Sequence, residues 1–576
     1  MPSCQNMSDN QSFPMPPRVC QLTKDGLHLS DDWRTAADDE YIVGIPKSCP
    51  ELSPSQALQA FRQDGFPGWG KFDGAFALVC YQRSTGQLHL AIDRFAFAEL
   101  FCTAVDGKLV FSSSLSALLA IPGISRDLSP QGLTDYLGLG YVTAPSTIYR
   151  NIWRAVAGGV CTFTASSCTF EYKRYWVPDY TAHDHLAWQE AIAQAKDKIN
   201  ARLTAALTGR KTAVLLSGGI DSSLLTALAC EQGLPPEAAF TAIYGDERYD
   251  EGTLAAQVAD RYHIPHQECH VTPASLDSVL SLLHDYGEPF ADSSLLPLSA
   301  LLRTVATAGF SSVLCGDGGD ELFGGYRRYQ AMLWRHVMSG LPAALAKFAG
   351  KCLLPFLPAP QDNRSRLANL TRSLRSLTLP PIEAYISFQE LFSREMRRQL
   401  LADSPETDYL DIWQSEGQIM NIKDAVERYN NLDLLHYLPE DGCRKGLVAN
   451  LQTGITCLAP LLSSSLLEWV MSLPRHYKTT LTDTKRLLKA IGTDLLPAQL
   501  LHRRKTGFGI PVATWLRGPW REQLRWLSES PQEWDRQGLF NHQVVKRLVS
   551  EHLEGRANHD ARLWALLLFA RFLEGR

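Results

Sequence analysis

The chain has 576 residues, more than one hydrophobic core normally supports, so its length predicts two or three domains. Hydrophobic residues make up 45% and charged residues 20% of it, as in ordinary soluble proteins, and the formal net charge of −5 gives no reason to expect a nucleic-acid partner. The 13 cysteines include no Cys-x-x-Cys pair and indicate reduced thiols. Without a signal-peptide core or an apolar run that could span a bilayer, we expect a cytoplasmic protein with no membrane association.

The N-terminal third is predicted to be rich in β-structure. Residues 1–17 are polar and proline-rich and read as a disordered leader. Between residues 18 and 180, short alternating segments predict an α+β domain. The predicted strands are Tyr41–Gly44, Gly74–Tyr81, Gln87–Ile92, Lys108–Ser112 and Val160–Thr164.

The remainder, residues 186–576, is predicted to form a second domain with an alternating βαβα order. A helix at Leu186–Leu207 precedes this order. The predicted strands are Ala213–Leu216, Ala238–Tyr244, Pro265–Val271 and Ser311–Cys315, and the predicted helices between them are Thr253–Tyr262, Leu276–Leu283 and Leu295–Ala308. This order predicts a doubly wound parallel sheet with its ligand at the carboxyl ends of the strands. From Arg327 the chain is predicted to be almost entirely helical, with a basic, proline-rich loop at Leu353–Arg366.

The first chemical motif is Ser217-Gly218-Gly219-Ile-Asp221-Ser222, between a strand and a helix whose inner face carries leucines. Two glycines at such a turn let the backbone approach a ligand closely, and the unpaired N–H groups of the first helical turn suit a phosphate. No Gly-x-x-x-x-Gly-Lys-Ser/Thr pattern is present, which excludes a Walker-type loop. Asp221 would repel a phosphate unless a magnesium ion bridged them. The alternative is a Gly-Gly turn in a nucleotide-free Rossmann-like sheet.

The second motif is an acidic, glycine-rich stretch from Cys315 to Tyr326. Asp317, Asp320 and Glu321 stand among glycines just before a helix. Close backbone approach combined with carboxylate oxygens suits a hard cation. An acidic turn or a calcium loop is the alternative, although the EF-hand spacing is absent.

The first motif resembles the pyrophosphate-binding loop (PP-loop) of the N-type ATP pyrophosphatases. With the second it closely resembles asparagine synthetases and the related β-lactam synthetases and lasso peptide cyclases. The resemblance implies ATP and Mg²⁺ as cofactors. The implied ATP-binding residues are Leu216, Ser217, Gly218, Gly219, Asp221, Ser222, Ile243, Gly316 and Lys485, with adenine near Leu216 and Ile243, and Asp221 and Asp320 as the magnesium ligands.

The same resemblance implies three catalytic residues. Lys485 would contact phosphate, and Lys505, within His502–Pro511, would stabilise the transition states of adenylation and amide formation. Asp317 stands where asparagine synthetases carry a glutamate and β-lactam synthetases a tyrosine. A solvated basic turn is the alternative for the arginines beside Lys505.

The N-terminal domain resembles the glutaminase-type N-terminal nucleophile (Ntn) domain of asparagine synthetases. The resemblance rests on Phe72–Ala77 and on Asp93-Arg94-Phe95. In that family a cysteine directly after the initiator methionine is the nucleophile, and its own α-amine is the base. Here residue 2 is proline and Cys4 and Cys20 are internal. We therefore expect a scaffold or docking domain, unless processing exposes one of these cysteines.

The C-terminal half departs from the family where the acceptor should bind. Tyr437–Asp441 and Lys445 match the start of the family's conserved helix. The family's Glu-x-Arg-x-Pro-Phe-Leu-Asp is replaced by Thr456–Ser463, so we expect altered substrate recognition in this segment.

The predicted activity is an ATP-dependent, AMP-forming amide ligation. The leading prediction is macrolactam closure of a lasso precursor peptide, which needs a carboxylate side chain and a free N-terminal amine, with a leader-peptide protease and a recognition protein as partners. One alternative is an amidotransferase using ammonia or glutamine on a small-molecule or envelope substrate. β-Lactam formation is disfavoured by Asp317. The non-enzymatic alternative is a peptide-binding pseudoenzyme, which the intact ATP motifs argue against.

Overall fold

The structure is a computed structural model that describes residues 19–23, 26–164, 169–180, 186–246, 248–338, 366–403, 405, 408–415, 422, 424–502, 508–529 and 532–575. The predicted leader 1–17, the predicted loop up to residue 365 and Lys505 lie outside these ranges. No helix in the described part of the chain combines the length and the apolar character needed to cross a bilayer.

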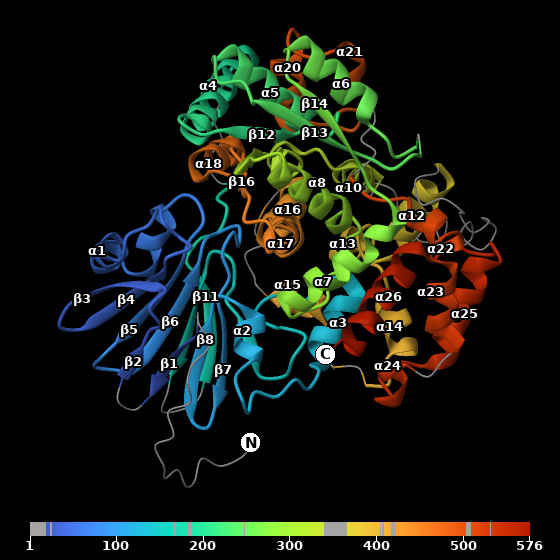
Figure 1. The fold of residues 1–576 in the computed structure, drawn as a ribbon. Helices are drawn as coiled ribbons and strands as arrows, with labels where there is room; N and C mark the ends of the chain where they lie inside the picture. Colours follow the sequence, from blue (N-terminus) through green and yellow to red (C-terminus); the bar gives the residue numbers. More distant parts are fainter. Residues whose placement is uncertain are drawn as a thin grey trace.

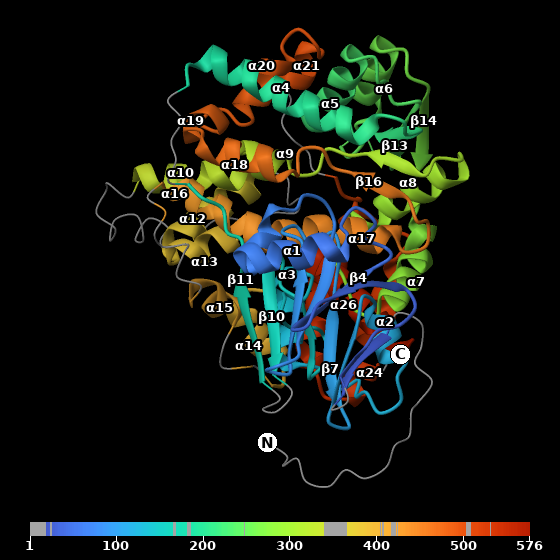
Figure 2. The ribbon, with the colours of Figure 1, turned by 90° about the vertical axis from the view of Figure 1, so that its left-hand side faces the viewer.

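The N-terminal domain contains two antiparallel sheets, at the lower left of Figure 1. One has the strand order β2-β1-β8-β7-β9 and the other β11-β10-β6-β5-β4-β3. The strands are β1 (Val19–Thr23), β2 (Gly26–His28), β3 (Trp33–Ala37), β4 (Tyr41–Pro46), β5 (Ala77–Gln82), β6 (Gln87–Ile92), β7 (Phe101–Val105), β8 (Lys108–Ser112), β9 (Ile152–Arg154), β10 (Gly159–Thr164) and β11 (Thr169–Arg174). The helices are α1 (Pro54–Asp64), η1 (Phe66–Lys71), α2 (Leu115–Leu119) and α3 (Pro130–Leu139). In Figure 2, α1 lies in front of the strands.

The predicted strand at Gly74–Tyr81 starts later than expected, because β5 begins at Ala77. The N–H of Phe76 donates to the buried Asp93 carboxylate at 3.3 Å, and the same carboxylate also accepts the N–H groups of Phe95, Phe97 and Ala98. Burial raises the pKa of Asp93 to about 6, and these four hydrogen bonds oppose that rise. Asp93 therefore organises the turn after β6 and ends the ladder at Ala77.

A five-stranded parallel sheet with the order β14-β13-β12-β15-β16 forms the centre of the second part of the chain. Its elements are α4 (Trp188–Leu207), β12 (Thr212–Leu215), α5 (Ile220–Glu231), β13 (Ala238–Ile243), α6 (Gly252–Arg261), β14 (His266–His270), η2 (Pro273–Ser275), α7 (Leu276–Tyr286), α8 (Leu295–Thr307), β15 (Ser312–Leu314) and β16 (Thr456–Leu458). In Figure 1, α4, α5 and α6 lie above the sheet and α8 lies below it. The predicted doubly wound parallel sheet is thus confirmed.

Helices fill most of the chain after β15, as predicted. They are α9 (Gly319–Phe323), α10 (Arg327–Met338), α12 (Arg366–Thr378), α13 (Pro381–Ile386), α14 (Arg394–Leu400), α15 (Tyr409–Ser415), α16 (Ala425–Leu432), the π-helix η5 (Asp433–Cys443), α17 (Arg444–Asn450), α18 (Ser464–Ser472), α19 (Arg475–Lys478), α20 (Arg486–Gly492), α21 (Ala498–His502), α22 (Val512–Arg517), α23 (Arg521–Glu529), α24 (Glu533–Arg536), α25 (His542–Leu553) and α26 (Asp560–Glu574). The sequence did not predict β16, which has only three residues and pairs with β15.

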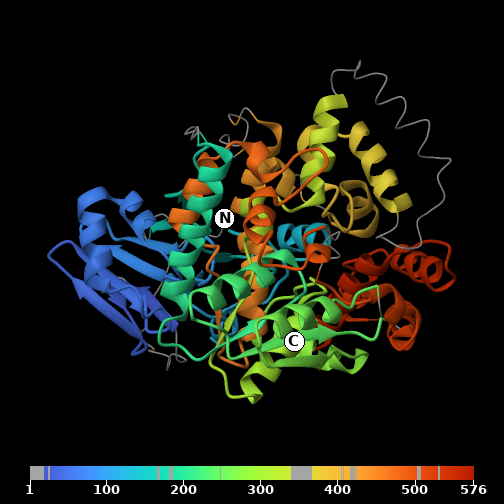
Figure 3. The ribbon, with the colours of Figure 1, turned by 90° about the horizontal axis from the view of Figure 1, so that it is seen from above.

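Three clusters of buried apolar side chains form among the described residues, and one of them extends across both parts of the chain. A single cluster of buried side chains joins Phe101, Leu118 and Tyr136 of the N-terminal part to Leu302 of α8 and Phe569 of α26. The Tyr136 hydroxyl donates to the carbonyl of Ala565 at 2.8 Å. Figure 3 shows the N-terminal domain on the left and the C-terminal helices on the right, with the parallel sheet between them.

Candidate functional site

Two glycine-rich loops meet at the carboxyl edge of the parallel sheet. The loop after β12 carries Ser217 to Gly219, and the loop after β15 carries Gly316 to Gly318. The strands β12 and β15 are parallel neighbours, with Ala213 opposite Val313. Their carboxyl ends therefore place both loops side by side, although about a hundred residues separate them in sequence.

The loop after β12 is held open toward a ligand by its own side chains. The backbone of Gly218 has φ 68°, and a Cβ there would lie 2.7 Å from the carbonyl oxygen of Glu251, so only glycine fits. The N–H of Ser217 donates to the Ser222 hydroxyl at 3.3 Å, and the N–H of Gly219 donates to the Ser217 hydroxyl at 3.2 Å. Gly219 precedes α5 without a side-chain cap, so the first turn of α5 presents N–H groups that suit an anion.

Lys485 links the two loops. Its ammonium contacts the Asp221 carboxylate and lies 2.7 Å from Oδ1 of Asp320. Burial alone would lower the pKa of Lys485, but the two carboxylates outweigh burial and raise the pKa above its ordinary value. The backbone of Lys485 has φ 52° where α20 begins, so the fold holds this side chain in place through an uncommon conformation. Asp221 and Asp320 therefore converge on one buried cation.

Glycines make this convergence possible. A Cβ on Gly319 would lie 2.4 Å from Cγ of Asp221. A Cβ on Gly325 would lie 2.0 Å from Oδ1 of Asp320 and 2.2 Å from Cε of Lys485. The glycines of the acidic motif thus leave the volume that the carboxylates and the lysine occupy.

The donor set at this point fits magnesium bound together with a nucleotide. Among the described residues, no three His, Cys, Asp or Glu side chains gather closely enough to hold a metal by themselves. Magnesium is commonly held by one or two carboxylates, with substrate phosphates and water completing its shell. Asp221 and Asp320 supply two such carboxylates, and they already face a positive charge.

A cavity of about 620 Å³ surrounds these groups, and we call it the first cavity. The predicted site residues that line it are Leu216, Ser217, Gly218, Gly219, Asp221, Ser222, Gly316, Asp317, Asp320 and Lys485. Ile243 does not line it, whereas Phe240 and Ala242 do, because alternate residues of β13 face opposite sides of the sheet. Ile243 instead lies against α6, where its side chain would meet a Cβ on Gly252 at 2.5 Å. Adenine near Ile243 stays a prediction, and Phe240 and Ala242 are the residues of β13 that line the first cavity.

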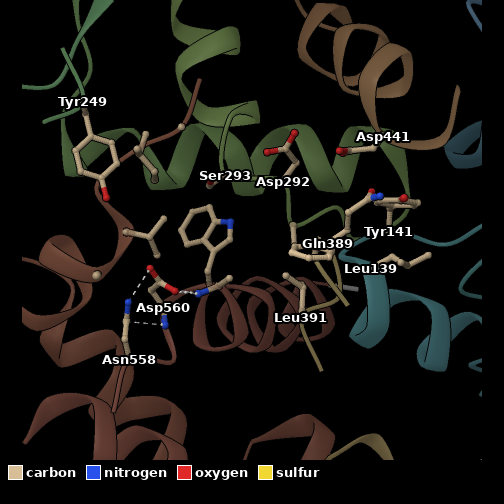
Figure 4. A pocket seen from close by; sticks show the side chains of 18 of the residues that line it. Leu139, Tyr141, Tyr249, Asp292, Ser293, Gln389, Leu391, Asp441, Asn558 and Asp560 are labelled. Carbon is tan, nitrogen blue, oxygen red and sulfur yellow. Dashed lines mark hydrogen bonds between the residues drawn. The ribbon is translucent and has the colours of Figure 1, made fainter. Parts of the chain in front are cut away.

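A second cavity of about 450 Å³ adjoins the first. Both cavities are lined by Asp292, Tyr437 and Asp441, which we call the shared wall. Figure 4 shows Asp292 and Asp441 beside each other, with Tyr249, Asn558 and Asp560 around the rest of the second cavity. Asp292 carries no sequence signal of its own, and most of the second cavity is lined by segments without a recognisable motif, apart from residues of Tyr437–Asp441 and His502–Pro511.

The shared wall carries charge. Lys445 of α17 lies 2.8 Å from Oδ2 of Asp292. Although burial would raise it, the Lys445 ammonium holds the pKa of Asp292 below its ordinary value. Burial and then the charge of Asp292 raise the pKa of Asp441 to about 7. One ionised and one readily protonated carboxyl group thus stand side by side between the two cavities.

The position of Cys20 in the fold differs from that of an Ntn nucleophile. It sits inside β1, opposite Phe111 of β8, and is fully buried. Burial raises the pKa of its thiol to about 11, and residues on both sides of it are paired within the sheet. A buried thiol of this kind, without an α-amine, is not a glutaminase nucleophile. Cys4 lies outside the described residues.

Comparison with known proteins places both parts of the chain. The Asparagine synthase family model matches residues 199–574, and the Glutamine amidotransferase domain model matches residues 56–176. A Mycobacterium bovis protein assigned as a glutamine-hydrolysing asparagine synthetase is 29% identical over 88% of this chain and 78% of its own length. Asparagine synthetase 1 of Bacillus subtilis is 23% identical over 87% of this chain and 77% of its own length. Among solved structures, the NH₃-dependent NAD synthetase of Campylobacter jejuni is 18% identical over 24% of this chain and 61% of that chain, with a TM-score of 0.17.

Proposed function

Since this chain belongs to the asparagine synthase family and is an ATP-dependent carbon–nitrogen ligase, we propose that it closes an amide ring within a peptide. The proposed reaction is the macrolactam closure of a lasso precursor peptide, in which an Asp or Glu side chain is adenylated and the N-terminal amine of the peptide displaces AMP. A leader-peptide protease would release that amine, and a recognition protein would deliver the precursor.

The observation that carries this proposal is the second cavity, which meets the first at Asp292, Tyr437 and Asp441. A ligase that uses ammonia needs little room beyond the activated carboxylate. An acceptor that belongs to a peptide needs a separate space beside it. The second cavity offers that space next to the first, and the buried Cys20 argues against nitrogen from glutamine.

In the first step, the substrate carboxylate attacks the α-phosphorus of ATP and pyrophosphate leaves. The N–H groups of the first turn of α5 and the Lys485 ammonium would hold the phosphates, since both point into the first cavity. Asp221 and Asp320 would hold magnesium, which when bound supplies positive charge to the departing pyrophosphate. The apolar side chains of Leu216, Phe240 and Ala242 offer a surface for the adenine ring.

In the second step, the amine attacks the acyl carbon and AMP leaves with the former carboxylate oxygen. The negative oxygen of the tetrahedral intermediate needs a positively charged neighbour to stabilise it. Lys505 is the residue that the sequence predicts for this role. Water has to be kept from the acyl-adenylate, which otherwise hydrolyses.

The test is a reaction of the purified protein with Mg-ATP, a candidate precursor peptide and its leader protease. We expect AMP and pyrophosphate, and a product lighter than the core peptide by one water. N-acetylated peptide should support adenylation but no ring, since the amine is blocked. The Asp221→Asn variant should lose both steps and keep its fold. Release of ADP, or an open peptide in every reaction, would contradict the proposal.

The second candidate is an amidotransferase that uses ammonia or glutamine on a small-molecule or envelope carboxylate. The assigned activity of the named relatives and the match to a glutamine amidotransferase domain favour it. It predicts that ¹⁵N from ammonia or glutamine enters the product without any peptide. Under the leading proposal, by contrast, the protein should release no glutamate from glutamine, and the Cys20→Ser variant should ligate at the wild-type rate. Glutamate release that is lost in Cys20→Ser would select this second candidate.

A further inference from the structure

A buried charge cluster joins the N-terminal domain to the helix that forms the shared wall. Its five members are Arg154 and Glu99 of the N-terminal domain, and Glu288, Glu440 and Arg444 of the ligase part. All five are at most 5% exposed. Burying charges is costly unless each one is paired and hydrogen-bonded, so such a cluster fixes the groups that take part in it.

Arg154 is the centre of this cluster. Its guanidinium contacts Glu288 directly and lies 3.7 Å from Glu99 and 3.8 Å from Glu440. It also donates to the carbonyl of Val142 at 3.2 Å. Burial would lower the pKa of Arg154, but the surrounding carboxylates, Glu288 foremost, raise it above its ordinary value. The side chain therefore stays charged and is held from several directions.

Arg444 repeats this pattern from the other side. It contacts Glu440 one helical turn away, lies 3.3 Å from Glu99, and donates to the carbonyl of Val142 at 2.7 Å. The hydroxyl of Tyr286 donates a hydrogen bond to the Glu99 carboxylate at 2.8 Å. Glu440 and Arg444 thus anchor the end of η5 and the start of α17 to the N-terminal domain.

The residues that follow these two anchors face the reaction site. Asp441 comes directly after Glu440 and lines both cavities, and Lys445 comes directly after Arg444 and lines the first. Lys445 holds Asp292, the second carboxylate of the shared wall, at 2.8 Å. One face of this helical segment is therefore held by the N-terminal domain, and the neighbouring face forms the shared wall.

We propose that Arg154 is a positioning residue for ligation, through which the N-terminal domain fixes Asp441 and Lys445 where the acceptor amine meets the activated carboxylate. This inference rests on the proposed function. It gives the N-terminal domain, whose Cys20 is buried, a part in the reaction, as a fixed wall behind the acceptor site. The groups proposed to act in adenylation, Asp221, Asp320 and Lys485, belong to other segments, so we expect adenylation to depend less on this wall than ring formation does.

The experiment compares wild type with Arg154→Lys. Lysine keeps the positive charge, but its single ammonium cannot contact the four partners that the planar guanidinium of arginine reaches. Two rates are measured for each protein: ATP–pyrophosphate exchange, which reports adenylation, and ring formation. We expect ring formation to fall roughly 10- to 100-fold while exchange stays within about twofold. In Arg154→Lys, acyl-adenylate that is not attacked by the amine should be hydrolysed by water. The amount of AMP released for each ring formed should therefore rise.

Arg202→Gln is the matched control. Arg202 of α4 also forms an ion pair across the domain junction, with Asp73 at 3.4 Å, but it contacts neither η5 nor α17. Both rates should stay at the wild-type level. An equal loss of exchange and ring formation in Arg154→Lys would show a merely structural role and overturn the proposal.

Hydrogen exchange separates this proposal from the proposed function, because it needs no substrate. In Arg154→Lys, amides of residues 436–450 should exchange faster, while those of residues 212–229 should not change. Faster exchange there supports the positioning role even if the wild-type enzyme closes no peptide ring. If neither the hydrogen exchange of residues 436–450 nor the rate of ring formation changes in Arg154→Lys, the positioning role is overturned. If Arg154→Lys fails to fold, Glu99→Gln tests the same connection from the N-terminal side.

Discussion

At the scale of single residues, Lys485 is the group whose removal should have the largest effect. Its ammonium is 7% exposed and balances two carboxylates. Lys485→Ala would remove the ammonium that Asp221 and Asp320 share, and breaking a buried pair of this kind costs about 3–5 kcal/mol. We expect a lower free energy of unfolding by chemical denaturation and a loss of AMP formation of at least about 100-fold.

The control for that variant is Lys196→Ala. Lys196 pairs with Glu231 at 2.9 Å, and both side chains are 39% exposed. Exposed pairs contribute about 0–1 kcal/mol, so stability and activity should hardly change. If the two alanine variants were equally stable, the buried bridge would not hold the loops together.

A second residue-scale prediction concerns the pH dependence of stability. The pKa of Asp441 is about 7 in the fold, against 3.8 for an ordinary aspartate. The native state thus holds this proton more tightly than the unfolded state. The resulting stability is fully present below about pH 4 and is lost as the pH rises through about 7. Relative to Asp441→Asn, the wild type should lose on the order of 4 kcal/mol across this window.

Denaturation of both proteins from pH 4 to pH 8 measures this difference. Asp127→Asn, at an exposed position, should follow the wild-type curve throughout. A wild-type curve that runs parallel to that of Asp441→Asn would mean that Asp441 is ionised in the native protein over the whole window.

At the scale of elements, the chemistry could be predicted where a motif follows a strand. The loops after β12 and β15 carry glycine and acid patterns that have a direct physical purpose, and the structure places both loops in the first cavity. The motifs did not predict which residues of β13 line the cavity, because the alternation of side chains along the strand turns Phe240 and Ala242, and not Ile243, toward it. The second cavity itself could not be predicted, although Tyr437–Asp441 carried a motif, since α3, α22 and α26 bring its other walls together only in the folded molecule.

The fit between the two loops gives an element-scale prediction. In Gly319→Ala, the added methyl group would enter the space of the Asp221 carboxyl, so α9 and α5 would have to move apart. We expect KM for ATP to rise and kcat to fall, together by about 100-fold in kcat/KM, with the far-ultraviolet circular dichroism unchanged. Gly70→Ala adds the same group in the N-terminal domain, away from both cavities, where the nearest atom, of Tyr175, lies at an ordinary contact distance of 3.4 Å, and should keep wild-type kinetics. Similar kinetics for both variants would argue against the interlocked loops.

At the scale of the whole molecule, the sequence predicted two domains but not the apolar cluster that crosses the boundary between them, beside the cluster that belongs to the N-terminal domain alone. The antiparallel sheets and the parallel sheet follow from strand patterns within each part of the chain. The packing of Tyr136 and Leu118 against α7 and α26 does not, because contacts between distant segments leave no local pattern. The N-terminal part therefore supports the ligase part as well as adjoining it.

This shared cluster predicts that the ligase part is not stable alone. A fragment of residues 186–576 would expose the apolar partners of Phe101, Leu118 and Tyr136, and each large side chain returned to water costs about 1.5–3 kcal/mol. Several such losses equal the whole net stability of a typical domain, about 5–15 kcal/mol. Light scattering and thermal unfolding should show an aggregating fragment without a cooperative transition.

By contrast, a full-length chain cut after folding, at a protease site placed within residues 181–185, should keep its two pieces together on gel filtration and keep ATP–pyrophosphate exchange. A soluble fragment that unfolds near the temperature of the intact chain would mean that the contacts across the boundary contribute little to its stability.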